Sequence, residues 1–163
     1  AVVYAEGLAD TVAVTIAPLV AGSVETTPAV ATLSPGDTTT LAATVRSSSG
    51  AVLVDVPLAW RSTDTTIARV NVAGTVTAIF YVGPLTRDVG IVASRDALAD
   101  TTLVTVAPLA VASIAITAPD SSVLPGASLQ LDARVRDAAA LLLEGRVVTW
   151  SSLDAAVATV SAG

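Results

Sequence analysis

The chain has 163 residues, of which 53% are apolar and only 13% are charged, and its formal net charge is -6. Its eight cations are all Arg and form no basic cluster, which argues against a nucleic-acid partner, since such proteins need a basic face. The absence of Cys, His, Met and Lys excludes disulfides, zinc or haem sites built on His or Cys, and Ser-His or Cys-His catalytic pairs. No apolar segment reaches the roughly 18 residues of a membrane-spanning helix.

Residues 1–18 predict a β-hairpin. Two strand-like runs, 1–5 and 11–16, flank a turn at 6–10, and Ala17-Pro18-Leu19 closes the segment. Two strands alone are marginally stable in water. We therefore expect this hairpin to pair with another part of the protein or with another copy.

Residues 19–108 predict a complete β-sandwich. Short Val- and Thr-rich runs alternate with Gly, Pro, Ser and Asp, and seven such strands with frequent turns are typical of this architecture. Pro57 lacks an N–H, which predicts that its strand lies at a sheet edge or begins irregularly. Leu58, Trp60 and the alternating Val76, Ala78 and Phe80 are expected to face the core. The expected strands are 23–31, 38–46, 54–61, 67–70, 75–82, 90–94 and 101–106.

One motif occurs twice and organises the chain. Residues 60–70 read W-x-S-x-D-x-x-[IV]-A-x-V, and the pattern returns at residue 150, 90 residues later. When residues 1–73 are laid on residues 91–163, 24 positions are identical. A fixed period indicates repeated modules. We therefore expect the C-terminal hairpin of one module (1–18), a complete module (19–108) and the N-terminal part of another (109–163); residues 74–90 have no second copy.

These motifs resemble the bacterial Ig-like domain, group 2, a module of bacterial surface proteins, adhesins and some phage virion proteins. The likeness is carried by L-x-P-G at 33–36, L-x-A-x-V at 41–45, the tryptophan motif, and G-T-V-T-A at 74–78. Two loops depart from the family pattern, at 83–90 and at 137–140. The resemblance implies an all-β fold of tandem immunoglobulin-like sandwiches, one complete and two partial, and an extracellular structural or adhesive role with no catalytic residues to carry over.

Several carboxylates admit a functional and a structural interpretation. Asp64 and Asp154 occupy the same turn in each copy, where they could bind calcium or cap backbone N–H groups as in Asx-turns. A calcium loop needs several carboxylates close together, so capping is preferred. Asp96 and Asp100, like Glu6 and Asp10, could form an acid/base pair. We expect them to be solvated loop charges instead.

Trp60 and Trp150 could stack on sugars, but in Ig-like sandwiches the tryptophan of this strand packs between the sheets. Thr38-Thr39-Thr40 could accept O-glycans, although strand or turn threonines are the simpler interpretation.

The sequence thus predicts a non-catalytic structural protein with no cofactor and no metal site. The expected role is an extracellular or cell-surface filament or stalk, because the 106–110 link leaves almost no slack and its Pro restricts the joint. The expected partners are adjacent modules or neighbouring copies of the chain, and head-to-tail strand complementation is one way in which copies could join. The alternative is an adhesin or phage-appendage module whose loops bind a host receptor or glycan.

Overall fold

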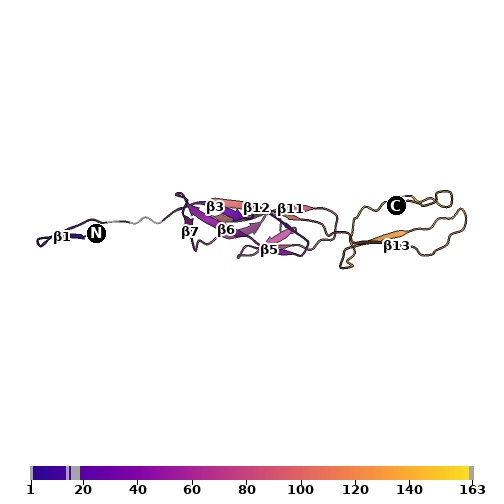
Figure 1. Cartoon of the computed structure of the whole chain (residues 1–163), viewed down its shortest axis with the longest axis horizontal. Coiled ribbons are helices and arrows are strands. Elements are labelled where there is room, and N and C mark those ends of the chain that lie inside the picture. The colour runs from indigo at the N-terminus through magenta and orange to yellow at the C-terminus, as the bar shows by residue number, and fades with distance from the viewer. Residues whose placement is uncertain (1, 14, 16–18, 162–163) are drawn as a thin grey trace.

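The computed structural model describes residues 2–13, 15 and 19–161. In Figure 1 the structure is elongated, with the N-terminal hairpin at one end, a central sandwich, and the C-terminal segment at the other end. The described residues form strands and no helix, so none of them forms a helix that could cross a membrane. The strands are β1 (Val2–Ala5), β2 (Leu8–Thr11), β3 (Ala21–Thr27), β4 (Val30–Leu33), β5 (Thr38–Thr40), β6 (Ala42–Ser47), β7 (Val52–Leu53), β8 (Ala59–Ser62), β9 (Ala68–Val70), β10 (Thr75–Ala78), β11 (Arg87–Arg95), β12 (Leu98–Val106), β13 (Ser113–Thr117) and β14 (Asp132–Arg136).

The central sandwich is built on one long four-stranded sheet, in the order β4-β12-β11-β8. Two three-stranded sheets, β3-β6-β7 and β5-β10-β9, pack against it and each encloses its own apolar cluster. The larger cluster includes Leu41, Val76 and Ile91, and the smaller one is formed by Val24, Val45 and Ala93. Trp60 packs against both clusters, so one aromatic side chain joins the two halves of a core otherwise made of small residues.

Two strands that the sequence predicts as continuous are each divided between sheets. The expected strand 23–31 is β3 followed by β4, and the break falls at Pro28, which has no N–H to continue a ladder. The expected strand 38–46 is β5 followed by β6, and the break falls at Leu41, which is 2% exposed. The prediction of seven strands was therefore wrong in number: the two divided segments give two additional strands, and β7 (Val52–Leu53) lies outside all the expected ones.

Three further expectations were wrong in detail. The run 54–61 is extended only as β8, at the edge of its sheet, because Asp55 adopts a positive φ of 54° and Pro57 follows it. The strand from Thr75 ends at Ala78, and Phe80 is 61% exposed rather than in the core. The predicted loop 83–88 ends earlier, since β11 begins at Arg87.

The N-terminal hairpin has a tighter turn than the sequence predicts. Strand β2 begins at Leu8 instead of Thr11, and the turn is Glu6-Gly7, with φ of 48° and 83°. Positive φ at both central residues suits the twist of a two-residue hairpin. Of the described residues in the expected strand 11–16, Thr11 ends β2, and residues 12, 13 and 15 belong to no strand. Residues 14 and 16–18 lie outside the described residues, so only Leu19 of the Ala17-Pro18-Leu19 link is described.

Backbone geometry repeats with the 90-residue period of the sequence. The hairpin pairs Val2 with Thr11 and Ala5 with Leu8, as β11 and β12 pair Val92 with Thr101 and Arg95 with Leu98. Strands β13 and β14 repeat the register of β3 and β6 in the same way, with Ile114 opposite Val135 as Val24 is opposite Val45.

The C-terminal segment forms fewer strands than its central counterpart. Residues 158–160 correspond to β9 but are not extended. In the central sandwich β9 pairs with β10, and the sequence equivalent of β10 is not present in this chain. The core face of β13 is also open: Ile114 is 58% exposed, whereas its counterpart Val24 is 8% exposed and packs with Val45 and with Ala93 of β11.

A glycine in the central sandwich tests its packing. At Gly74, with φ of 78°, an added Cβ would lie 2.6 Å from the carbonyl oxygen of Leu41 and 3.0 Å from the Trp60 ring. Gly50 has a similar φ of 87° with open space around it. Gly50→Ala should lower the free energy of unfolding by about 1–2 kcal/mol through backbone strain alone, and Gly74→Ala by a further ~1–3 kcal/mol through overpacking. Urea denaturation of both variants measures this, and equal losses would contradict the close packing described here.

Candidate functional site

The turn after the central tryptophan is organised by Asp64. Its carboxylate accepts hydrogen bonds from the backbone N–H of Thr66 at 2.8 Å and from the Thr66 hydroxyl at 2.6 Å. Its backbone carbonyl accepts from the N–H groups of Ile67 and Ala68. The hydroxyl of Thr66 and the backbone N–H of Thr66 hold the pKa of Asp64 below its ordinary value, with a smaller contribution from Arg87. This is the capping arrangement that the sequence favours.

The second copy of this turn has the same geometry without the hydroxyl. The backbone N–H of Ala156 donates to the Asp154 carboxylate at 2.9 Å, and Val157 and Ala158 donate to its carbonyl. Among the described residues, no group of three or more carboxylates is placed to hold a metal ion. Both aspartates therefore act on their own turns.

Asp96 and Asp100 are separated by the structure. Asp96 is exposed and lies 3.7 Å from the guanidinium of Arg95, a surface ion pair of small energetic value. Asp100 lies in β12 and reaches the other layer of the sandwich, where it accepts from the backbone N–H of Thr26 at 2.7 Å and from the Thr26 hydroxyl at 2.8 Å. The expectation of a solvated loop charge was therefore wrong for Asp100.

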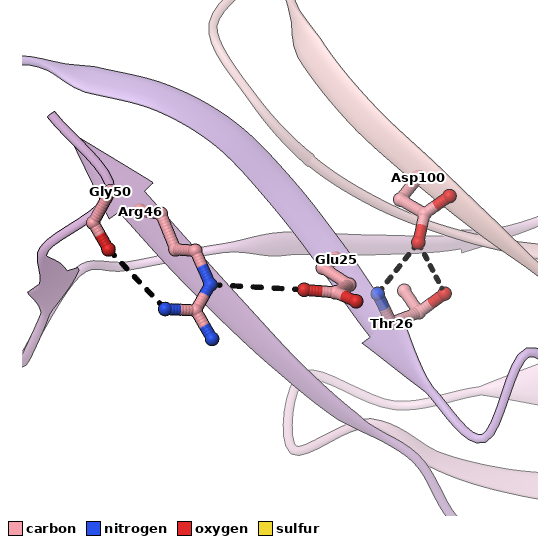
Figure 2. A network of polar contacts seen from close by, with 5 residues as sticks. All are labelled: Glu25, Thr26, Arg46, Gly50 and Asp100. Atoms are coloured by element: carbon pink, nitrogen blue, oxygen red, sulfur yellow. Dashed lines mark hydrogen bonds and ion pairs between the residues drawn. The ribbon is translucent and has the colours of Figure 1, made fainter. Parts of the chain in front are cut away.

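Figure 2 shows how this contact joins the two layers. Strand β3 is the edge of its sheet, so the N–H of Thr26 has no strand partner there, and Asp100 supplies the acceptor. On the other side of the same strand, Glu25 and Arg46 form an exposed ion pair at 3.8 Å, and Arg46 donates to the carbonyl of Gly50. The hydrogen bond from the backbone N–H of Thr26 is the largest cause that lowers the pKa of Asp100, and the bond from the Thr26 hydroxyl is the second.

Trp60 and the threonines at 38–40, the other candidate residues, pack in the core or pair within a sheet. Trp60 packs between the two apolar clusters. Thr38–Thr40 form β5, which pairs with β10, and the hydroxyls of Thr40 and Thr75 lie 3.4 Å apart. The side chain of Asp10 lies outside the described set, and Glu6 is exposed.

The most constrained surface is the junction between the central sandwich and the C-terminal segment. The N–H of Ala107 donates to the carbonyl of Leu33 in the sandwich at 2.9 Å. Two residues later, the carbonyl of Leu109 accepts from the guanidinium of Arg146 at 2.6 Å. Only Pro108 separates these two attachments, and its ring fixes its own φ.

A second contact crosses this junction. Pro84, in the loop before β11, lies against Gly145, where an added Cβ would stand 3.3 Å from Pro84 Cδ. The Nε of Arg146 is buried without a hydrogen-bond partner, as expected for a guanidinium drawn in to reach Leu109. Sequence reasoning anticipates the short link but misses Arg146 and Asp100, since nothing in the local sequence pattern marks a contact over 37 or 74 residues.

With this geometry described, comparisons with known proteins can be made. Residues 110–163 match the family model of the bacterial Ig-like domain (group 2). The resemblance predicted from the sequence is therefore confirmed over residues 110–163, about a third of the chain. No curated protein sequence matches the chain.

Two solved structures are similar in fold. The structure of surface layer protein SbsC, domains 4–9, has a TM-score of 0.52 and 18% identity, and the match covers 87% of this chain and 24% of that one. The structure of the S-layer protein SbsC, domains 5–6, has a TM-score of 0.47 and 17% identity, covering 77% of this chain and 67% of that one. The chain thus spans about a quarter of the larger structure, and its all-β Ig-like fold is one that a surface-layer protein also uses.

The contact of Asp100 with Thr26 predicts a pH-dependent contribution to stability. Because the folded pKa of Asp100 is lowered, the contribution is full above the ordinary Asp pKa of about 4 and is lost as the pH falls through the folded value. Asp100→Asn should lower the free energy of unfolding by about 1–2 kcal/mol at pH 7, and the difference from wild type should shrink below about pH 4. Asp96→Asn, which removes only the exposed ion pair, is the matched control. Denaturant titrations from pH 7 to pH 2 measure both, and a pH-independent difference for Asp100→Asn would contradict this account.

Proposed function

We propose that this chain is a non-catalytic structural element, a stiff array of Ig-like modules in an extracellular or cell-surface filament or stalk. The coarser part of this statement, an Ig-like domain with the fold of surface-layer domains, rests on the comparisons above. The proposed division is a C-terminal hairpin at 1–18, a complete module at 19–108 and the N-terminal part of a module at 109–163.

The observation that carries the proposal is the junction. A flexible tether would leave the link free, whereas here Ala107 is bonded to one side and Leu109 to the other, with Pro108 between them. The contact of Pro84 with Gly145 adds a second point of support away from the link. Two separated contacts resist bending as well as twisting, and repetition of a stiff junction along a tandem array makes a rod.

Its partners, in this proposal, are adjacent modules and further copies of the chain. Head-to-tail strand complementation is supported by register: the hairpin β1–β2 has the pairing of β11–β12, the hairpin that in the central sandwich completes the layer beside β8. The C-terminal segment presents the counterpart of β8, at residues 149–152, without such a hairpin in the chain. A second copy could supply it through main-chain hydrogen bonds.

Arg146 is the residue through which junction stiffness is best tested. Arg146→Met keeps an extended apolar side chain but removes the bond to Leu109, worth about 1–1.5 kcal/mol, and should raise the population of bent junctions roughly fivefold. Small-angle X-ray scattering should then show a broader distribution of interatomic distances.

Arg69→Met, at an exposed position in β9, is the control and should scatter like the wild type. If Arg146→Met and Arg69→Met scatter alike, the junction is not held by this contact and the stiff-rod proposal loses its support.

Strand complementation predicts growth of head-to-tail oligomers with concentration. Light scattering of the 163-residue chain should reveal species larger than a monomer, and removal of residues 1–11 should abolish them, because the donated hairpin is gone. Oligomers that persist without residues 1–11 would rule out this mode of assembly while leaving the stiff junction untouched.

A further inference from the structure

The central sandwich carries an apolar groove at its N-terminal end. Three segments line it: 19–21 before β3, 52–56 around β7, and 95–98 in the turn between β11 and β12. Its volume is about 850 Å³. We call it the N-terminal groove.

The rim of this groove exposes large apolar side chains. Leu19 is 59% exposed, Val20 71%, Val52 53% and Val54 79%. The described charges at the rim are Arg95 and Asp96, which neutralise one another, and Asp55. A contiguous apolar patch rimmed by polar groups is typical of an interaction surface.

The equivalent surface of the C-terminal segment is contacted by the central sandwich in this structure, although Leu142 there is still 44% exposed. Residues 142–146 correspond to 52–56 by the 90-residue period, and Pro84 of the central sandwich lies against Gly145 there. The backbone is the same at both places: Gly145 has φ of 64° and its counterpart Asp55 has φ of 54°. The N-terminal groove is therefore the same surface, one repeat earlier.

Two leucines are more buried at the contacted surface than at the N-terminal groove, whereas Val111 is 53% exposed and its counterpart Ala21 is partly buried. Leu143 is 4% exposed, whereas its counterpart Leu53 is only partly buried. Leu109 is partly buried, whereas its counterpart Leu19 is 59% exposed. This holds although the C-terminal segment has fewer strands of its own with which to cover these residues.

We propose that the N-terminal groove seats the loop of a preceding Ig-like module, the loop equivalent to Gly83–Thr86, with its proline against Asp55. This inference rests on the proposed function in its form of adjacent modules in one tandem array, because a module completed by strand complementation between two copies of this chain would lack the equivalent of the loop at 83–86. It names the surface of one module that is contacted, the N-terminal groove, and the loop of the preceding module that contacts it.

The chemistry of this seat differs from that of the observed junction. Val56 stands where the C-terminal segment has Arg146, so no guanidinium is available to hold the link, and apolar packing of the loop on Val52, Leu53 and Val54 replaces the hydrogen bond. At the equivalent Gly145 an added Cβ would lie 3.3 Å from Pro84 Cδ, so the Cβ of Asp55 would require the proline to shift by a few tenths of an ångström.

The test uses a lengthened chain in which residues 1–108 are followed by residues 19–163. The new link, Ala107-Pro108-Leu19, reproduces the natural Ala107-Pro108-Leu109. The protein has no Cys, so an introduced pair reports on its own contact alone. Pro84→Cys in the first copy is combined with Asp55→Cys in the second copy, and disulfide formation is followed in air.

The reference pair is Pro84→Cys with Gly145→Cys in the 163-residue chain, and the non-contact control pairs Val72→Cys of the first copy with the second copy's Asp55→Cys, since Val72 is 93% exposed. The proposal predicts cross-linking at a rate close to that of the reference pair. A rate equal to that of the non-contact control overturns it. If the reference pair also fails, the stiff junction fails with it; if only the new pair fails, the stiff junction stands.

A second measurement avoids the substitution of Pro84. Val54→Cys in the 163-residue chain should react freely with a thiol reagent, since residue 54 is 79% exposed. In the second copy of the lengthened chain the same residue should react about tenfold more slowly, the ratio for a seated state favoured by about 1.4 kcal/mol. Equal rates in the two chains would overturn the proposal.

Discussion

The hydrogen bonds on either side of Pro108 decide how this protein behaves as a whole. Ala107 is tied to Leu33 and Leu109 to Arg146, so the chain passes between repeats without a free residue other than a proline. If either bond were absent, the same modules would be joined by a flexible link and could change their relative orientation. With both, the direction of one module sets the direction of the next, which is the property that the proposed stiff array requires.

Stability within the sandwich relies on a few contacts because the side chains are small. The core is dominated by Val and Ala, with Trp60 reaching both apolar clusters and Asp100 linking β12 to the edge of β3 (Figure 2). Such a core buries little area per residue, so packing around Gly74 and the charge-assisted bonds of Asp100 contribute a larger share of the stability than they would in a core rich in Leu and Phe.

Much of the fold follows from the sequence, because the repeat fixes register before any contact is known. The 90-residue period places Trp60 and the Asp64 turn correctly and predicts the N-terminal hairpin with the wrong strand bounds, and alternation places Leu41 and Val45 in the core. Where the chain passes from one sheet to another, at Pro28 and Leu41, the alternation of apolar and polar residues continues, so the sequence pattern does not reveal the strand break. Phe80 follows the period of β10 but lies beyond its last ladder bond, and Arg146 meets Leu109 through tertiary contact alone.

The central claim is that the junction is rigid, and a distance distribution tests it most directly. Spin labels at Cys residues introduced for Val72 and Val147, which are 93% and 97% exposed, report across the junction by double electron–electron resonance. A control pair at Val72 and Val54 lies within the central sandwich. The account predicts a single distribution across the junction about as narrow as that of the control. A broad or multimodal distribution, with a narrow control, would contradict it.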